Sequence, residues 1–183
     1  MEPWHRLDET MVYEGDLRMA HRRFRRADGG EASYDINLRP SGVSVLALTG
    51  DDQVVLALQF RPGPERVLYD LPSGFVDPGE EPAVAAAREL AEETGYEGDM
   101  REVGRSTPDA YSTEVRHIFV ATDCELTRQP DTDEDEDIEV VLVSLDQLRD
   151  LLRNDRLTTV DAAYLALDSL GLLCPGPDPA SET

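Results

Sequence analysis

The stretch GFVDPGEEPAVAAARELAEETGY, from Gly74 to Tyr96, combines a loop rich in glycine and proline with a short helical pattern. Pro82 suits the first turn of a helix, and Gly95 suits the position just past a helix end. The spacing therefore predicts a helix from about Pro82 to Thr94. Its predicted packing face carries mostly small side chains, three and four residues apart, which would let the helix lie close against a sheet. These residues are Ala83, Ala87, Leu90 and Thr94.

Three carboxylates on this helix lie where an isolated helix disfavours them. Glu89, Glu92 and Glu93 repel one another at helical spacing, and the last two lie near the negative end of the helix dipole. Each penalty is roughly 1 kcal/mol or less, so a solvated acidic face is one interpretation. The other is a metal site, because a rigid loop precedes the carboxylates and no His or Cys lies nearby. Such oxygen ligands suit Mg²⁺ or Mn²⁺, and Mg²⁺ usually shares its ligands with substrate phosphates.

The same stretch resembles the Nudix box, G-x5-E-x7-R-E-U-x-E-E-x-G-U, in which U is aliphatic. Leu90 fits the first aliphatic position, and Tyr96 departs from the last one. The resemblance implies an α/β/α sandwich with a mixed sheet and metal-dependent hydrolysis of a nucleoside diphosphate linked to another moiety. Every fixed position of the box is matched, by Gly74, Glu80, Arg88, Glu89, Glu92, Glu93 and Gly95.

The resemblance also assigns roles within the box. Glu89, Glu92 and Glu93 would bind Mg²⁺, or alternatively Mn²⁺, with the carbonyl of Ser73 as a further ligand. Glu93 and Arg88 thereby join the catalytic group, and Arg88 and Glu80 would orient the carboxylates. The cations would neutralise the pyrophosphate oxygens and lower the pKa of a bound water.

Residues outside the box resemble one branch of the family, the ADP-ribose pyrophosphatases and nucleotide-sugar hydrolases. That branch commonly reads Q-[YF]-R-P before an L-P-A-G-like turn, and this chain has QFRPGPERVLYDLPSG. Arg61 is then a phosphate or ribose contact, or alternatively half of a surface ion pair. In YSTEVRHIFVAT, Glu114 matches a glutamate that helps to bind substrate or metal. The loop before it departs from the branch, with TPDAYSTE where many ADP-ribose hydrolases have Ser-Pro-Gly.

An acidic run, DTDEDEDIEVV, begins at Asp131. In the resembled branch an acidic loop at this place supplies the glutamate that activates or positions the attacking water. Glu134 is our first choice for that catalytic residue, and Glu136 is the second. A solvated acidic turn is an equal alternative.

The rest of the chain predicts two units and a tail. Residues 1–40 are polar and arginine-rich, and alternation on both sides of a turn at residues 14–16 predicts a small antiparallel β-subdomain. Residues 41–172 form the Nudix domain, with the strands VSVLALTG, QVVLALQF, RVLYDLP, VRHIFVATDCEL and IEVVLVSL, and helices at about 145–153 and 159–170. Residues 173–183 are expected to be a disordered tail.

The resemblance extends to the N-terminal subdomain. In the resembled branch this subdomain often exchanges across a two-fold dimer and helps to form the nucleobase pocket, which implies a homodimer here. Trp4 and Tyr13 would then stack on a base, or alternatively pack within the subdomain.

Composition narrows the partners. With 183 residues, the chain is long enough for one sizeable core. Its 17 basic residues are all arginine and face 39 acidic ones, and a net charge of -22 makes duplex nucleic acid a poor partner. The basic cluster HRRFRR, residues 21–26, is expected on one exposed strand or at a small anion. The acidity fits a solubilising surface or a salty cytoplasm.

The sequence predicts no membrane partner. It has no apolar run that approaches a membrane span, only two cysteines, and no apolar segment at its start that resembles a signal peptide. We therefore expect a soluble cytoplasmic protein.

Three classes of function follow from these observations. The first is hydrolysis of ADP-ribose or a related nucleoside diphosphate sugar to a nucleoside monophosphate and a sugar phosphate. GDP-mannose-like sugars and dinucleoside polyphosphates are alternative substrates. The second class is a non-catalytic Nudix-like module that binds a nucleotide as a regulatory ligand. The third is an acidic interaction protein, for which the box would be a coincidence.

Overall fold

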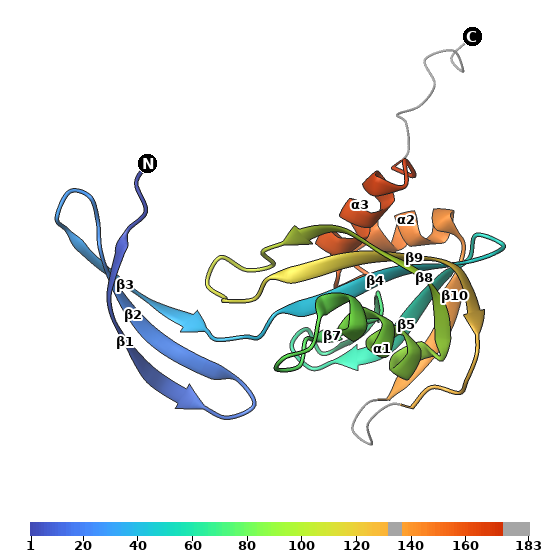
Figure 1. The fold of residues 1–183 in the computed structure, drawn as a ribbon, viewed down its shortest axis with the longest axis horizontal. Coiled ribbons are helices and arrows are strands. Elements are labelled where there is room, and N and C mark those ends of the chain that lie inside the picture. The colour runs from blue at the N-terminus through green and yellow to red at the C-terminus, as the bar shows by residue number, and fades with distance from the viewer. Residues whose placement is uncertain (132–136, 174–183) are drawn as a thin grey trace, which may run out of the picture.

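The computed structural model describes residues 1–131 and 137–173. Its elements, in chain order, are β1 (His5–Glu14), β2 (Arg18–Arg25), β3 (Glu31–Asn37), β4 (Gly42–Thr49), β5 (Val54–Arg61), β6 (Arg66–Asp70), β7 (Ser73–Phe75), α1 (Pro82–Thr94), β8 (Tyr96–Ser106), β9 (Arg116–Leu126), β10 (Ile138–Val143), α2 (Leu145–Arg153) and α3 (Val160–Ser169). The expected mixed sheet with helices and the small N-terminal antiparallel sheet are both present (Figure 1).

The first three strands form a separate antiparallel sheet in the order β1-β2-β3 (Figure 1). Residues 21–25 of the cluster HRRFRR lie on one strand, β2, which is the central strand of this sheet. Its arginines form ion pairs with carboxylates of the neighbouring strands, such as Arg22 with Glu9 and Arg23 with Asp8. These cross-strand pairs explain the arginine-rich pattern, because opposite charges on adjacent strands stabilise a sheet.

The main sheet has the strand order β10-β5-β4-β9-β8, with β6 paired to β5 and β7 paired to β4. Among the strands of the described residues, one pair of this sheet is parallel, the central pair of β4 with β9. Strands β4 and β5 pair through just two residues next to their tight turn, Ala47 with Val55 and Leu48 with Val54. Beyond that point β4 pairs with β7, whereas β5 pairs with β6. The sheet therefore splits along its middle, and a gap opens between two of its strands.

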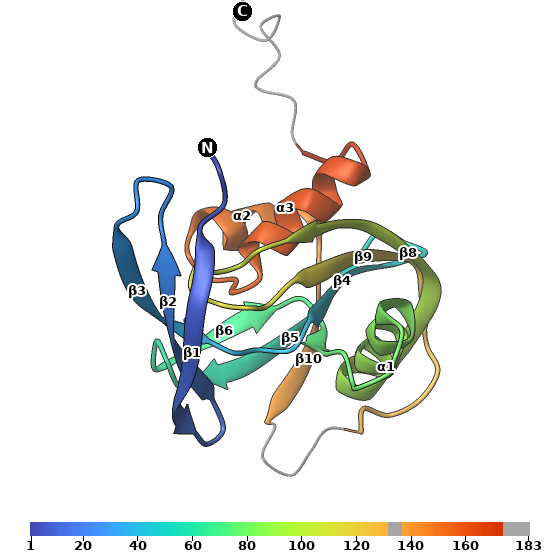
Figure 2. The same cartoon turned by 60° about the vertical axis from the view of Figure 1, so that its left-hand side comes forward.

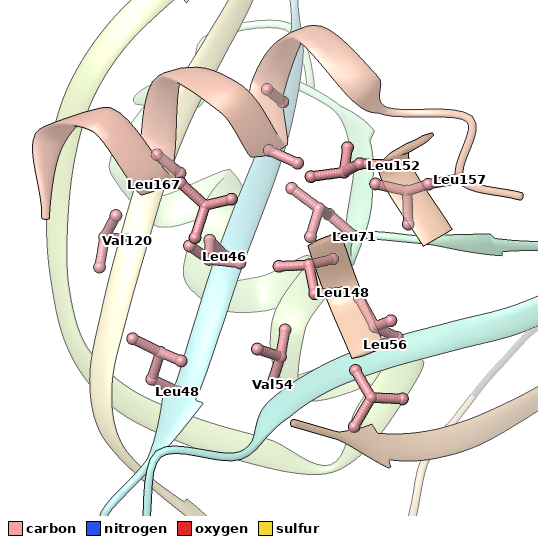
Figure 3. Packing of buried hydrophobic residues seen from close by; sticks show 14 of the residues in the cluster. Leu46, Leu48, Val54, Leu56, Leu71, Val120, Leu148, Leu152, Leu157 and Leu167 are labelled. Atoms are coloured by element: carbon pink, nitrogen blue, oxygen red, sulfur yellow. The ribbon is translucent and has the colours of Figure 1, made fainter. Parts of the chain in front are cut away.

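Helices cover both faces of this sheet, as Figures 1 and 2 show from two directions. Helices α2 and α3 pack on one face over a leucine-rich core that includes Leu46, Leu56, Leu71 and Leu148 (Figure 3). Helix α1 packs on the other face over a second core of smaller side chains. No helix within the described ranges is both long and apolar enough to span a bilayer.

Helix α1 has the expected bounds, but its buried face was predicted wrongly in part. Leu90 and Thr94 are buried as expected, whereas Ala83 and Ala87 are exposed. Small residues occupy both sides of this helix, so spacing alone did not identify the packing face. The alanines that do contact the core are Ala85, Ala86 and Ala91.

Strand β8 was not predicted from the sequence. Its segment, YEGDMREVGRS, contains two glycines and five charged residues, a composition that is depleted in strands. It forms because it pairs with β9 along nearly its whole length, from Tyr96 to Ser106. Tertiary pairing therefore overrides a weak local preference.

Candidate active site

A cleft of about 1070 Å³ opens where β4 and β5 diverge. The loop before α1, one side of α1 itself and the segment between α2 and α3 complete its walls. Seven carboxylates and four guanidinium groups of described residues line it. They are Asp70, Asp77, Glu89, Glu92, Glu93, Glu114 and Asp131, with Arg39, Arg61, Arg88 and Arg116.

Arg88 explains how helix α1 tolerates its neighbouring carboxylates. Its Nη1 donates to Glu89 at 2.9 Å and to Glu92 at 3.0 Å, and its Nε donates to Glu80 at 3.1 Å. The guanidinium thus lies between groups that would otherwise repel. The hydrogen bond from Arg88 and, secondly, the backbone N–H of Asp77 lower the pKa of Glu80. The same contacts, led by that with Glu80, raise the pKa of Arg88.

Glu93 does not belong to a solvated face, because only 7% of its surface is exposed. The backbone N–H of Ser73 donates to its Oε2 at 3.0 Å, which joins the loop to the last turn of the helix. Gly74, beside this contact, has a close neighbour of its own. A Cβ at position 74 would lie 2.1 Å from the carboxylate of Glu89, so the glycine makes room for that side chain.

The predicted metal ligands therefore share one wall of the cleft. In the described chain no three acidic, imidazole or thiol groups converge on one point. Glu89 and Glu92 meet at Arg88, and Glu93 meets the amide of Ser73. Their chemistry still fits a hard divalent cation, because all of these donors are oxygen atoms. If Glu89 and Glu92 moved away from Arg88, their carboxylate oxygens would be free to bind a cation in the cleft.

Arg61 forms an ion pair, as the alternative interpretation expected, but the pair is not on the surface. Both Nε and Nη2 of Arg61 donate to Oδ2 of Asp70, the former at 2.8 Å. Asp70 is completely buried, and its other oxygen, Oδ1, accepts a hydrogen bond from the hydroxyl of Thr158. Arg61 itself is partly exposed and lines the cleft.

Glu114 lines the cleft among arginines. Arg116 donates to it at 3.1 Å, and Arg39 lies 3.7 Å away. The second Nη of Arg116 donates to Asp161 at 3.0 Å, at the start of α3. Arg39 also lies over the ring of Phe75, 5.0 Å from its centroid. The buried carboxylate of Glu114 therefore lies between the guanidinium groups of Arg39 and Arg116, near the start of β4.

The two aromatic residues predicted to stack on a base lie in the N-terminal sheet. Neither Trp4 nor Tyr13 is among the described residues that line the cleft of the same chain. Trp4 stacks beside Tyr34, with ring centroids 6.4 Å apart, and the ring of Tyr13 covers Gly15 in the β1–β2 turn. Both residues remain partly exposed, at 39% for Trp4 and 56% for Tyr13, and base stacking stays a prediction.

Glu134 and Glu136, the two candidates for water activation, lie outside the described residues. Asp131, at the start of the same run, is described and lines the cleft, because its N–H donates to the carbonyl of Glu92 at 2.9 Å. Sequence reasoning also missed Asp70, Thr158, Arg39 and Arg116. Asp70 and Arg116 lie within the two stretches that resemble the family branch, but no role was assigned to either, and Arg39 and Thr158 lie outside those stretches. Three-dimensional pairing brings the four together.

Comparison with known proteins identifies the family. The family model described as NUDIX domain matches residues 38–164, which is more than half of the chain. This chain belongs to the Nudix family. The residues of its Nudix box are those that form the wall of carboxylates described above. It is accordingly a Nudix hydrolase.

Several characterised proteins are similar to this Nudix hydrolase. An ADP-ribose pyrophosphatase of Bacillus subtilis is 32% identical over 140 residues, which cover 75% of this chain and 76% of that protein. A methanol dehydrogenase activator of Bacillus methanolicus is 30% identical over 149 residues, which cover 76% and 80%. A solved structure described as an ADP compounds hydrolase superposes with a TM-score of 0.79 at 24% identity, covering 94% of this chain and 98% of that one. The last match shows a shared fold.

Proposed function

We propose that this Nudix hydrolase uses Mg²⁺, or Mn²⁺ in its place, to cleave ADP-ribose or a related nucleoside diphosphate sugar. The products would be a nucleoside monophosphate and a sugar phosphate. The observation that carries the metal requirement is the charge of the cleft, where seven carboxylates face four arginines.

Each of those arginines is already paired with a carboxylate of the chain. Arg39 and Arg116 contact Glu114, Arg61 contacts Asp70, and Arg88 contacts the glutamates of the box. The described cleft therefore retains excess negative charge, which would repel a pyrophosphate. Bound divalent cations reverse that repulsion, and the oxygen ligands for them are at hand.

The expected substrate rests on the relatives. The Bacillus subtilis protein and a 28% identical protein of Mycobacterium tuberculosis are both ADP-ribose pyrophosphatases. Another relative, 33% identical over 147 residues, hydrolyses a CMP-linked phosphonate. These names share a nucleotide joined through a phosphate linkage, which favours the enzyme over the regulatory module. We further propose that the base is adenine and the sugar is ribose, as in ADP-ribose.

In this mechanism Glu89, Glu92 and Glu93 hold the cation, with the Ser73 carbonyl as a further ligand. When bound, the metal supplies charge neutralisation and a water of lowered pKa. Arg88 and Glu80 fix the positions of the carboxylates, and Arg61 holds an oxygen of the substrate. Glu114 orients the substrate or the cation. Glu134, with Glu136 as second candidate, activates or positions the attacking water.

A substrate screen tests this function. Purified protein is incubated with ADP-ribose, GDP-mannose, a diadenosine polyphosphate and CMP-linked compounds, each with Mg²⁺, with Mn²⁺ or with a chelator. Released phosphomonoesters are detected after coupling to a phosphatase. We expect turnover of ADP-ribose that depends on the cation. Nucleotide binding without turnover of any compound would instead indicate the regulatory module.

The substitution Glu93→Gln tests the metal wall. It removes one negative charge but keeps an oxygen that can accept from the Ser73 N–H. We expect kcat to fall by about 10³-fold or more, because metal activation supplies several kcal/mol. The metal-free melting temperature should hold or rise, since a repelling charge is lost.

The matched control is Glu97→Gln, an exposed glutamate just beyond the helix that does not line the described cleft. This control should keep full activity. Retention of more than about a tenth of wild-type activity by Glu93→Gln at saturating Mg²⁺ would falsify the role of Glu93.

The homodimer is a further part of the proposal. A base contact by Trp4 or Tyr13 would have to come from a second copy, since neither residue lines the described cleft of its own chain. Light scattering of the purified protein decides between a dimer and a monomer.

A further inference from the structure

The segment between α2 and α3 contributes a cleft wall that the Nudix box does not explain. Residues 156–158 run alongside β6, because the N–H of Tyr69 donates to the carbonyl of Arg156 at 2.9 Å. In return, the N–H of Thr158 donates to the carbonyl of Tyr69 at 3.1 Å. The next residue is fixed as well, since Thr159 Oγ1 accepts from the N–H of Leu71 at 3.0 Å. Backbone pairing thus sets the position of Thr158 at the edge of the cleft.

From this position the hydroxyl of Thr158 donates to Oδ1 of Asp70, while Oδ2 of Asp70 accepts from Arg61. The three residues form a chain from the α2–α3 segment, through a fully buried carboxylate, to a guanidinium that lines the cleft. A buried carboxylate with one cation and one hydroxyl leaves little choice of orientation, since each of its oxygens has its own donor.

The orientation of Asp70 in turn fixes that of Arg61. A guanidinium is planar, and Asp70 engages the edge formed by Nε and Nη2. The remaining end, Nη1, is therefore directed away from the carboxylate. Because Arg61 lines the cleft and is 35% exposed, this end is available to an anionic oxygen of a ligand.

We propose that Thr158 and Asp70 are positioning residues that hold Arg61 in the orientation in which it binds the substrate phosphates. This inference rests on the proposed function for its ligand, a nucleoside diphosphate derivative. It assigns a role in substrate binding to a residue outside the Nudix box. Thr158 belongs to the segment between α2 and α3 and is distant from the box in sequence. Loss of the hydroxyl would leave Arg61 present but less well oriented.

Two variants separate the hydroxyl from the shape of the side chain. Thr158→Val removes the donor at nearly constant volume, and Thr158→Ser keeps it. With ADP-ribose, we expect Thr158→Val to raise KM by about 3- to 10-fold with kcat within about twofold. This is the size of one ordinary hydrogen bond, because the lost contact acts on the substrate only through Arg61. Thr158→Ser should stay close to wild type.

A double-mutant cycle shows whether the threonine acts through the arginine. In an Arg61→Gln background, Thr158→Val should have no further effect on KM, because the group that it orients has gone. An equal rise of KM in both backgrounds would mean that Thr158 contacts the substrate directly, and it would overturn the proposal. If ADP-ribose is not a substrate, the same cycle is run with whichever compound the screen shows to be turned over.

A spectroscopic measurement without substrate keeps the two proposals distinguishable. The Nε–H resonance of Arg61, assigned by its loss in Arg61→Lys, should exchange slowly with water in wild type and in Thr158→Ser. It should exchange faster in Thr158→Val. Unchanged exchange in Thr158→Val would refute the positioning role even if the enzyme hydrolyses ADP-ribose. Faster exchange in a protein that hydrolyses nothing would support the positioning and contradict the function.

Discussion

Arg88 offsets the mutual repulsion of the glutamates around it. Considered alone, the glutamates of α1 are mutually repulsive and lie at the unfavourable end of a helix. In the fold Arg88 contacts Glu80, Glu89 and Glu92 together, and it also donates to the carbonyl of Phe75 at 3.1 Å. The arginine therefore ties the loop to the helix as well as balancing charge. This double role explains why the box needs a guanidinium, whose fork has several fixed donors, rather than a simple cation.

Both candidates for activating the attacking water lie in the acidic run, outside the described residues. If Glu134 activates the nucleophilic water, Glu134→Gln should lower kcat by roughly 10² to 10⁴-fold with little change in substrate or metal affinity. Glu136→Gln should do much less. The measurement is kcat for both single variants and the double variant. Equal, small effects would mean that the run is a solvated turn, and a dominant effect of Glu136→Gln would exchange the two roles.

Glu102 gives a prediction about pH. A hydrogen bond from His117, and next one from Arg105, lower its pKa from the ordinary value of 4.5. A carboxyl whose pKa is lowered by folding stabilises the folded state at pH values above its ordinary pKa of 4.5. This contribution is lost as the pH falls through the lower pKa of the folded state. Wild type should therefore be more stable than Glu102→Gln near neutral pH, and this difference should shrink as the pH falls below 4.5 and through the lowered pKa of the folded state.

Urea unfolding of both proteins across this range measures the effect. Comparing the two proteins cancels the general gain that an acidic chain obtains when its other carboxylates are protonated. A difference in stability that stays constant with pH would show that the His117 contact does not act through the charge of Glu102.

At the scale of elements, the end of α1 depends on Gly95. This residue has φ 76°, and a Cβ there would lie 2.2 Å from the carbonyl oxygen of Arg128. Gly95→Ala should therefore combine backbone strain with a clash against main chain and destabilise the fold by roughly 2 kcal/mol or more. Activity should fall with it, because the carbonyls of Gly95 and Glu92 anchor the segment that begins at Thr127 and leads to Asp131.

Two other glycines serve as matched controls. Gly79 has φ 87° with open space around it, so Gly79→Ala carries strain alone, about 1 kcal/mol. Gly50 has neither a positive φ nor a close neighbour, so Gly50→Ala should be neutral within about 0.5 kcal/mol. Denaturant unfolding should rank the three variants in this order. Equal losses for Gly95→Ala and Gly79→Ala would show that the contact with Arg128 relaxes without penalty.

The elements that sequence reasoning predicted share strong local signals. Helix α1 begins at Pro82 and is followed by Gly95, and α2 is preceded by Ser144, whose capping box with Gln147 is formed in the structure. The strands rich in valine and leucine were equally clear. Strand β8 lacked such a signal, and β7 is only three residues long. Local pattern therefore predicts the elements whose own sequence carries a strong signal.

The candidate site also contains residues that the sequence identified and residues that only the fold brings together. The box residues follow one another in sequence, and a fixed spacing identified them. Asp70 and Thr158 are 88 residues apart and meet only because the α2–α3 segment pairs with β6. No spacing along the chain encodes such a contact. The second wall of the cleft could therefore be found only in three dimensions.

At the scale of the whole molecule, net charge is the dominant property. With a charge of -22, repulsion among carboxylates should exceed the attraction in the ion pairs of the surface. Screening then favours the folded state, and the melting temperature should rise as KCl increases from low to molar concentration. A flat or falling melting temperature would identify an ordinary solubilising surface.

One pair of facing residues offers a control for the origin of the salt dependence. Glu97 and Glu125 lie directly opposite each other on β8 and β9, and both are exposed. Like charges in this arrangement destabilise a sheet. Neutralising both as glutamine should raise the melting temperature at low salt and reduce its dependence on KCl. If the double variant responds to salt as wild type does, local repulsion between strands is not a significant part of the effect.

The parallel pairing of β4 with β9 also sets an order of events during synthesis. The N-terminal sheet needs only the first 37 residues, and its strands are joined by short turns, so it can form while the rest of the chain is still being made. The central pair of the main sheet instead requires β9, which ends at Leu126. Until the ribosome has released that strand, β4 lacks its main neighbour and the leucine-rich core cannot close. The slow step of folding should therefore be the joining of these two distant strands.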